Sequence, residues 1–382
     1  MAEAFKLLIN PARVAHTAHH LHRAWPAFDA ARFTALATDG LDALEFKARA
    51  QRLADALQAT LPPAFDRALG VVCDALAPPL PLDAQGEPVG LQDGLHPDGI
   101  AGWALWGVGE WVVRAGAHEV PRALAGLHAI TQRFTAEFAI RPFLAHAPEA
   151  VWPVLRRWVD DDSAHVRRLV SEGSRPRLPW GLRLQAAIAD PTPALPLLAA
   201  LQDDASAYVR RSVANHLNDI AKDHPARVAE WVARHRPGAS PAREALLRHA
   251  SRGLIKAGHP ATLRAWGLTP GFDGEASLAL DRAAVPIGGA LTITARLRAH
   301  RATRAVVDLV VHHQRARGGT SPKVFKGWTL DLAAGEVEQR VRVHALREVS
   351  TRRLYPGEHR VALQVNGAVV AEAPFVLLAA DS

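Results

Sequence analysis

Apolar and polar positions divide the chain into two parts with different periodicities. Up to residue 268, apolar residues recur at three- and four-residue spacing, as in DALEFKARAQRLADALQATL and ASAYVRRSVANHLNDIA. This spacing predicts one helix after another. Prolines mark the breaks between these segments, for example at Pro62-Pro63, Pro225 and Pro260. We therefore expect a helical domain over residues 1–270.

The helical part is interrupted by one segment and repeats itself after it. Residues 77–99 (APPLPLDAQGEPVGLQDGLHPDG) are too rich in proline and glycine for a helix, which predicts a loop between an N-terminal bundle (1–76) and repeats (100–270). In the repeats, HVRRLVSEG and YVRRSVANH align at their Val-Arg-Arg triplets. Two-helix repeats must stack to bury their apolar faces, so a HEAT-like α-solenoid is expected.

A β-rich pattern replaces the helical one after TPGFDGE. Seven runs rich in β-branched or alternating apolar residues follow, and they read SLAL, ALTITARLRA, RAVVDLVVHHQ, KVFKGWTLDL, VEQRVRVHA, HRVALQV and VVAEAPFVLL. Short strands at this spacing are typical of a β-sandwich. The string LYPGEHRVALQVNGAVV resembles the corner and last two strands of an immunoglobulin-like domain. We therefore predict a mainly α chain that ends in an immunoglobulin-like β-sandwich over residues 271–382.

The charge of the chain favours a polyanionic partner. Lys and Arg number 45 against 38 Asp and Glu, which gives a net charge of +7. Basic residues are concentrated between Thr292 and Lys326, where eight of them face a single acid. Phosphate contacts are expected from residues of this segment, which are Arg315, Arg317, Lys323 and Lys326.

Several other classes of protein are disfavoured by what the sequence lacks. Cys73 is the one cysteine, so a reducing, cytoplasmic compartment is expected and no disulfide framework can form. No apolar run has the length of a membrane span or signal peptide. His16, His19, His20 and His22 share a helical segment, but no matching acid or cysteine set accompanies them, so neither a metal nor another cofactor is expected.

Three acidic residues, each expected on a helix, recur at the interval of the helical repeats. Glu137 lies in RFTAEFAIRPFL, Glu172 in HVRRLVSEGSRPRLPW and Asp219 in YVRRSVANHLNDIAKDHP, with steps of 35 and 47 residues. HEAT repeats run about 40–47 residues, and their equivalent helices line one concave face. Each acid alone would suit an ordinary surface ion pair. At this spacing, however, the three carboxylates can converge on one site.

Basic and aromatic residues accompany these acids. Trp180 lies beside two arginines in a predicted loop, which makes it a candidate for contact with a sugar or base. Trp106 and Trp111 are expected in the core. The arginines expected to hold DNA phosphates near the acids are Arg141, Arg168, Arg175, Arg177 and Arg211.

The strings EFAIRPF and SEGSRPRLPW, with the VRRSVANHLNDIAKDHP block, resemble DNA alkylation repair proteins of the AlkC type, which are HEAT-like-repeat DNA glycosylases. The resemblance covers nearly the whole chain and includes the immunoglobulin-like domain. It implies a monofunctional glycosylase that removes 3-methyladenine and 3-methylcytosine from duplex DNA without full base flipping. It also implies that Glu137, Glu172 and Asp219 are the catalytic acids.

The chemistry of these lesions suits a site built from carboxylates. An N3-methylated base carries a positive charge and leaves as a neutral molecule, so no general acid is needed. A carboxylate can stabilise the oxocarbenium-like sugar, and a second one can orient water. No lysine near these motifs suits Schiff-base chemistry. We expect a monomer in the cytoplasm, associated with the nucleoid, whose partner is alkylated duplex DNA.

Two other functions are compatible with the same patterns. A non-catalytic α-solenoid scaffold would bind protein through an apolar or mixed concave face. A DNA-structure-binding protein without catalysis would share the basic surface but release no base.

Overall fold

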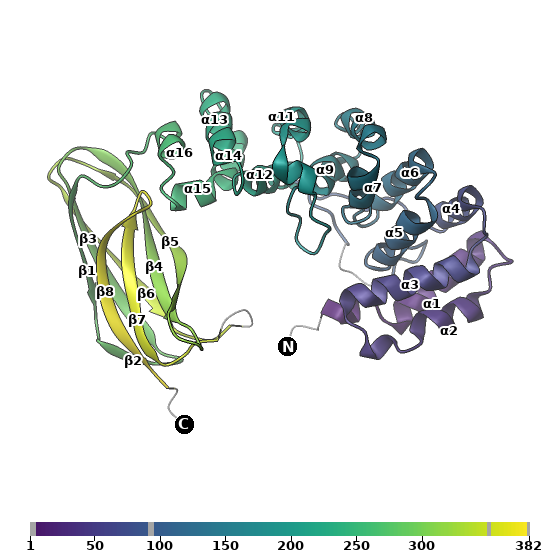
Figure 1. Ribbon diagram of the computed structural model, residues 1–382, viewed down its shortest axis with the longest axis horizontal. Coiled ribbons are helices and arrows are strands. Elements are labelled where there is room, and N and C mark those ends of the chain that lie inside the picture. Colours follow the sequence, from purple (N-terminus) through teal and green to yellow (C-terminus); the bar gives the residue numbers. More distant parts are fainter. Residues whose placement is uncertain (1–4, 91–94, 350–352, 380–382) are drawn as a thin grey trace. The chain divides into compact units, whose positions relative to one another are not determined.

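Helices form the first two thirds of the chain and strands the last third (Figure 1). The computed structural model describes residues 5–90, 95–349 and 353–379. It contains two compact units, Met1–Asp223 (unit 1) and His224–Ser382 (unit 2). The predicted fold class, helices followed by a β-sandwich, is confirmed.

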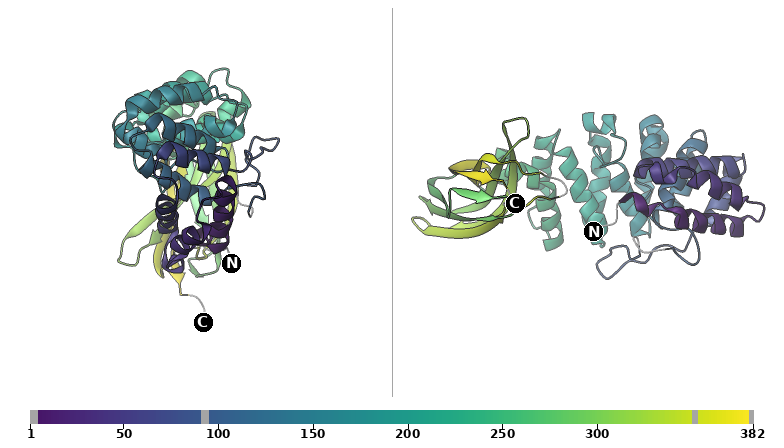
Figure 2. Two further views of the ribbon diagram at one scale, coloured as in Figure 1. Left: turned by 90° about the vertical axis from the view of Figure 1, so that its right-hand side faces the viewer. Right: turned by 90° about the horizontal axis from the view of Figure 1, so that it is seen from below.

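Unit 1 begins with a bundle of short helices. The elements are η1 (Phe5–Leu8), α1 (Pro11–Ala24), α2 (Ala30–Thr38), η2 (Leu41–Ala43), α3 (Phe46–Thr60) and α4 (Phe65–Asp74). Helix α1 starts where the Asn10 side chain accepts a hydrogen bond from the Arg13 amide at 3.0 Å, which caps its first turn. Helices α1 and α3 both pack against α2, and the three lie together in Figure 2.

The predicted loop of residues 77–99 forms no helix over its described part, and residues 91–94 lie outside the described residues. It is fastened to later helices by hydrogen bonds. The Leu80 carbonyl oxygen accepts from His165 Nε2 at 3.0 Å, and the Gly86 carbonyl oxygen accepts from Ser206 Oγ at 2.9 Å. Because His165 lies in the first turn of α9 and Ser206 precedes α12, the loop helps to fix the two helices that carry the site.

The rest of unit 1 is an array of helices that pack on their sequence neighbours. They are α5 (Ala104–Ala115), α6 (Val120–Thr131), α7 (Ile140–His146), α8 (Pro148–Trp158), α9 (Ala164–Gly173), α10 (Gln185–Ala189), η3 (Thr192–Ala194), α11 (Leu195–Leu201) and α12 (Ala207–Ile220). Helices α6, α8 and α11 have proline in their first turn, where its missing N–H costs nothing. Trp106 and Trp111 are buried, as expected.

Unit 2 joins four helices to a β-sandwich. The helices are α13 (Pro225–His235), α14 (Pro241–Ala250), α15 (Arg252–Lys256) and α16 (Pro260–Ala265). The strands are β1 (Gly274–Leu280), β2 (Ala284–Pro286), β3 (Ala290–Ala299), β4 (Thr303–Gln314), β5 (Thr320–Leu332), β6 (Val337–Ala345), β7 (Gly357–Val365) and β8 (Ala368–Leu378). Their orders are β1-β3-β6 in one sheet and β2-β8-β7-β4-β5 in the other. All seven predicted strands are present, and β2 was missed.

The two sheets share one core, and the sandwich is tied to the helices of its own unit. Alternate residues of β3 and β4, such as Ile293 and Leu309, lie in that core. Gly367 in the β7–β8 turn approaches Gly258 so closely that a Cβ on Gly367 would lie 2.1 Å from the Gly258 Cα. The Asn366 side-chain Nδ2 donates to the Thr269 carbonyl oxygen at 2.9 Å. These contacts fix α15 and α16 on the sandwich.

Candidate active site

Helices α9 and α12 pack against each other and bring two of the three predicted acids together. Glu172 lies in the last turn of α9 and Asp219 in the last turn of α12. The third acid, Glu137, lies in a turn just before α7, so the prediction that it lies on a helix is wrong. All three carboxylates are buried, and Asp219 is only 1% exposed.

Arg175 joins Glu172 to Asp219. Its Nη1 donates to Glu172 Oε1 at 2.5 Å, and its Nε donates to Asp219 Oδ2 at 2.8 Å. The remaining oxygens also have donors: Ser212 Oγ lies 2.6 Å from Glu172 Oε2, and Lys222 Nζ lies 2.8 Å from Asp219 Oδ1. Both carboxylates are therefore held by charged or polar donors from two helices and the loop that follows α9.

Arg168 joins Glu137 to the same network. Its Nη1 donates to Glu137 Oε2, and its Nη2 lies 3.6 Å from Glu172 Oε1. The guanidinium lies 5.1 Å from the centre of the Tyr208 ring, which supports it by a cation–π contact. Carboxylates and cations thus alternate along one chain of contacts, which we call the acid–base chain: Glu137, Arg168, Glu172, Arg175, Asp219 and Lys222.

The acid–base chain keeps its central carboxylate ionised. Burial raises the pKa of Glu172, but the charges of Arg168 and Arg175 and the hydrogen bond from Ser212 outweigh burial, and its pKa is lowered overall. The three carboxylates and three cations balance in number. The contacts between them fix the carboxylates in place, where they can face a cationic base.

His216 is a buried neutral base beside the acid–base chain. Its Nδ1 donates to the Ser171 carbonyl oxygen at 2.9 Å, and burial lowers its pKa to about 4. The imidazole is therefore neutral at pH 7, with its proton on Nδ1 and a lone pair on Nε2. Its position places a second polar group on the α12 face that carries Asp219.

Trp180 is the exposed aromatic residue of the site. It is 61% exposed and has a φ of +62°, a left-handed conformation that costs a non-glycine residue about 1 kcal/mol or more. Arg141 holds its loop (residues 174–184): Nη1 donates to the Gly173 carbonyl oxygen at 2.8 Å and Nε to that of Leu182 at 2.5 Å. The neighbouring loop contacts thus maintain an unfavourable backbone conformation that presents the indole outward.

The structure places Arg141 differently from the sequence expectation. Its side chain is fully buried, and burial lowers its pKa to about 10. It was expected to hold DNA phosphate, but its guanidinium anchors the Trp180 loop from the inside. We therefore assign it no phosphate contact. Arg168 and Arg175 likewise lie inside the acid–base chain, where they hold carboxylates.

The other predicted DNA contacts lie nearer the surface. Arg177 forms two hydrogen bonds to Asp223, at 2.8 and 2.7 Å, and Arg211 pairs with Glu87. Exposed pairs of this kind contribute little to stability, so a phosphate can compete for these arginines. In unit 2, Arg315 and Arg317 lie in the exposed β4–β5 turn, whereas Lys323 and Lys326 lie on β5.

Sequence reasoning missed two members of the site. Lys222 had a signal, because it follows Asp219 by three residues and so shares its side of the helix end. Thr135 had none: its hydroxyl donates to Glu137 Oε2 at 2.8 Å and accepts from Arg168 Nη1 at 2.9 Å. That role depends on a helix 33 residues further along the chain.

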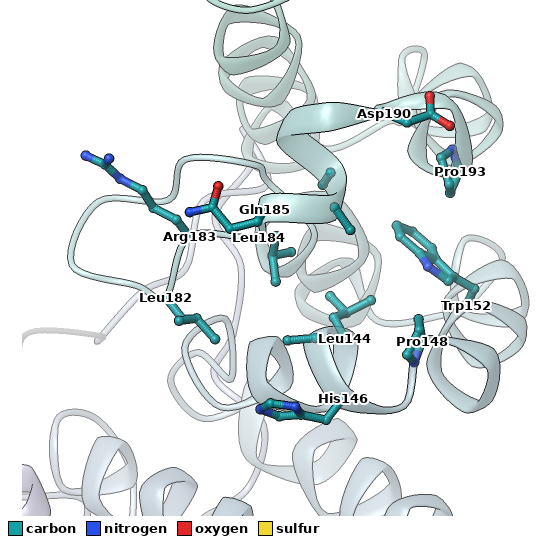
Figure 3. Close-up of a pocket in the computed structure, with 13 residues that line it drawn as sticks. Leu144, His146, Pro148, Trp152, Leu182, Arg183, Leu184, Gln185, Asp190 and Pro193 are labelled. Atoms are coloured by element: carbon teal, nitrogen blue, oxygen red, sulfur yellow. The ribbon is translucent and has the colours of Figure 1, made fainter.

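A cavity of about 500 Å³ is lined in part by Leu182, Arg183 and Leu184 of the Trp180 loop (Figure 3). Side chains of α7, α8, α10, η3 and the loop line it, and His146, Trp152 and Pro193 are among them. Its described lining includes no member of the acid–base chain. The cavity is therefore separate from the carboxylates, although Leu182 belongs to both the cavity wall and the anchored loop.

The described residues hold no group of three or more side chains suited to a metal ion. His16 contacts His20 at 3.1 Å between their Nε2 atoms. Within the same residues, every helix is too short or too polar to span a bilayer.

Comparison with known proteins gives relatives over the whole chain. Residues 275–379 match the family described as "Uncharacterised protein YhaZ, C-terminal Ig-like domain". The YhaZ protein of Bacillus subtilis (strain 168) is 32% identical over 370 residues, which is 95% of this chain and 96% of that protein. A solved structure of the alkylpurine DNA glycosylase AlkC of Pseudomonas fluorescens, bound to DNA containing an abasic site analog, is 33% identical with a TM-score of 0.85. That match covers 98% of this chain and 99% of the other.

Proposed function

Since the chain belongs to the AlkC family of DNA glycosylases, we propose that it hydrolyses the N-glycosidic bond of cationic alkylated bases in duplex DNA. The proposed substrates are 3-methyladenine and 3-methylcytosine. The observation that carries this proposal is the acid–base chain, in which Glu137, Glu172 and Asp219 are buried and fixed by shared arginines.

The reaction breaks the bond between C1′ of the sugar and the base nitrogen. The bonding electrons leave with the base, which becomes neutral and requires no proton. The sugar gains positive charge, and a fixed carboxylate, Asp219 or Glu172, stabilises it. Water then attacks C1′, and a second carboxylate orients this water and accepts its proton. The products are the free base and an abasic site.

The cations of the chain hold the carboxylates and do not take part as nucleophiles. Arg168 lies between Glu137 and Glu172, and Arg175 lies between Glu172 and Asp219. Rotation of any of these three carboxylates would break a contact with an arginine. Lys222 Nζ lies 2.8 Å from Asp219 Oδ1, so this lysine is assigned the same role of holding an acid. The proposed activity is therefore monofunctional, without strand cleavage.

Three further proposals rest on the family resemblance. The lesion is captured without full base flipping, one copy of the chain acts alone, and the protein works in the cytoplasm on the nucleoid. Hydrolysis needs no cofactor, because water is the only co-reactant.

A single assay tests the proposed function. The full chain is incubated with methylated duplex DNA, and released bases are separated by chromatography. We expect free 3-methyladenine and 3-methylcytosine, with abasic sites in equal amount and no strand breaks before alkali treatment. DNA binding without base release would overturn the proposal in favour of a non-catalytic DNA-binding protein.

A further inference from the structure

A second cavity, of about 430 Å³, lies within unit 2 between helices α14 and α15 and strands β4 and β5. Its walls carry basic side chains from three different elements: Arg248, Arg252, Lys256 and Lys326. Among its described lining residues, Asp308 is the one acid. We call this site the basic cavity. Its formal charge is about +3 when Asp308 is ionised and +4 when it is not, so it attracts anions in either state.

We propose that the basic cavity binds a phosphodiester group of the DNA backbone. This inference rests on the proposed function for the identity of the polymer. Of its residues only Lys326 was singled out from the sequence, because the other three cations come from helices that sequence reasoning treated as repeats. The size of the cavity suits a phosphate with part of its sugar, and Trp328 and Thr329 provide a wall for that sugar.

An aromatic ring and the helix geometry position the cations of the basic cavity. Arg248 lies 5.1 Å from the centre of the Trp266 ring, so an aromatic face supports its guanidinium. Arg252 and Lys256 are four residues apart on α15 and therefore lie on one side of it. Like charges this close repel each other, and an anion bound in the cavity reduces that repulsion.

Lys326 lies next to a β-bulge in strand β5. Pairing between β4 and β5 shifts between Val307 and Asp308, and Gly327 is the extra residue. A Cβ at Gly327 would lie 2.4 Å from the Val307 carbonyl oxygen, so only glycine fits there. The Gly327 amide donates to Asp308 Oδ1 at 3.3 Å. A bulge of this kind changes the direction of the neighbouring side chains.

A substitution of Asp308 should change DNA affinity in the opposite direction from the loss of a cation. Its carboxyl is buried beneath the cations, and burial raises its pKa. An anion in the cavity competes with this carboxylate for the charges of Lys256 and Lys326. Asp308→Asn keeps an oxygen for the Gly327 amide but removes the competing charge, so it should bind DNA more tightly.

The experiment measures the affinity of the full chain for undamaged duplex DNA, by fluorescence anisotropy, at a series of salt concentrations. The double variant Arg252→Ala/Lys326→Ala should lower the slope of log K against log salt by about 0.9, because the cavity holds one phosphate and each lost phosphate contact removes about 0.9. The matched control is Arg282→Ala/Arg360→Ala, which removes two cations of unit 2 outside the cavity and should keep the wild-type slope. Asp308→Asn should tighten binding several-fold.

Equal salt slopes for the double variant and its control would overturn the proposal. Weaker DNA binding by Asp308→Asn would also overturn it, provided that the thermal unfolding midpoint of this variant is unchanged. The outcome is separable from the test of the proposed function. If the wild type releases methylated bases but the slopes agree, only the basic cavity loses its role. If no base is released but the slope falls as expected, the phosphate site stands and the proposed reaction fails.

Discussion

The substitution Asp219→Asn should slow base release by about 10²-fold while leaving the fold intact. Asparagine keeps the shape of the side chain and one acceptor oxygen, but it removes the negative charge. Two unit charges about 4 Å apart interact by about 4 kcal/mol at the effective dielectric of about 20 that describes such sites. Because Arg175 and Lys222 already offset part of the Asp219 charge, we expect about 3 kcal/mol, at the lower end for a lost electrostatic stabiliser.

The assay is single-turnover release of 3-methyladenine from duplex DNA with enzyme in excess. A matched control is Asp204→Asn, which breaks another buried pair: Arg167 donates to Asp204 at 2.6 Å, and neither residue belongs to the acid–base chain. Both variants lose one carboxylate of similarly low exposure, so their thermal unfolding midpoints should fall by similar amounts. Only Asp219→Asn should lose the catalytic rate.

Two results would refute this reasoning. A single-turnover rate for Asp219→Asn within about threefold of wild type would show that this charge does not stabilise the transition state. An equal loss of rate in Asp204→Asn would show that the effect comes from general destabilisation of the helices.

Four other outcomes are expected. The pKa of Glu172 is lower in the folded protein than its ordinary value of 4.5, so its charge stabilises the fold at pH values above 4.5, and this stabilisation is lost as the pH falls through the folded pKa. The free energy of unfolding of Glu172→Gln, measured in urea at a series of pH values, should therefore depend less steeply on pH than that of the wild type. Trp180→Gly should weaken duplex binding by on the order of tenfold in anisotropy, because a stacking ring is lost, and should not lower the thermal midpoint, because glycine accepts the positive φ. Arg315→Glu/Arg317→Glu should bind DNA more weakly and with a shallower salt slope, whereas an unchanged slope would exclude the β4–β5 turn from the interface. Duplexes with hypoxanthine or 1,N6-ethenoadenine should release no base by chromatography, since a neutral leaving group needs an acid that this site keeps ionised; their efficient release would show that a general acid exists.

Local patterns were enough to predict most of the fold. Prolines placed the breaks between helices, because a proline is accepted in the first turn and rejected in the interior. Alternation revealed the long strands. Strand β2 escaped because it has three residues and ends in Pro286, so it offers no alternation to detect.

The site was predicted less completely because its geometry depends on long-range contacts. Repeat spacing drew attention to the three acids, but it could not show that Arg175 reaches an aspartate 44 residues away. Glu137 was expected on a helix because its neighbours have good helical spacing. Instead the Thr135 hydroxyl accepts from the Glu137 amide at 3.2 Å, and the charge of Arg168 holds the carboxylate, so tertiary contacts override the local preference. The burial of Arg141 likewise depends on tertiary structure, because the loop of residues 174–184 packs over its side chain.

The sharing of each arginine between two acids means that the acids are not independent positions. Removing Asp219 leaves Arg175 wholly to Glu172, and removing Glu172 leaves it wholly to Asp219, so each single change is partly compensated by the partner that remains. Removing both leaves a buried guanidinium without a counter-ion, which should cost more stability than the sum of the two single changes. A chain that loses both acids should therefore lose Arg175 as well, whereas the loss of one acid alone leaves this arginine a counter-ion.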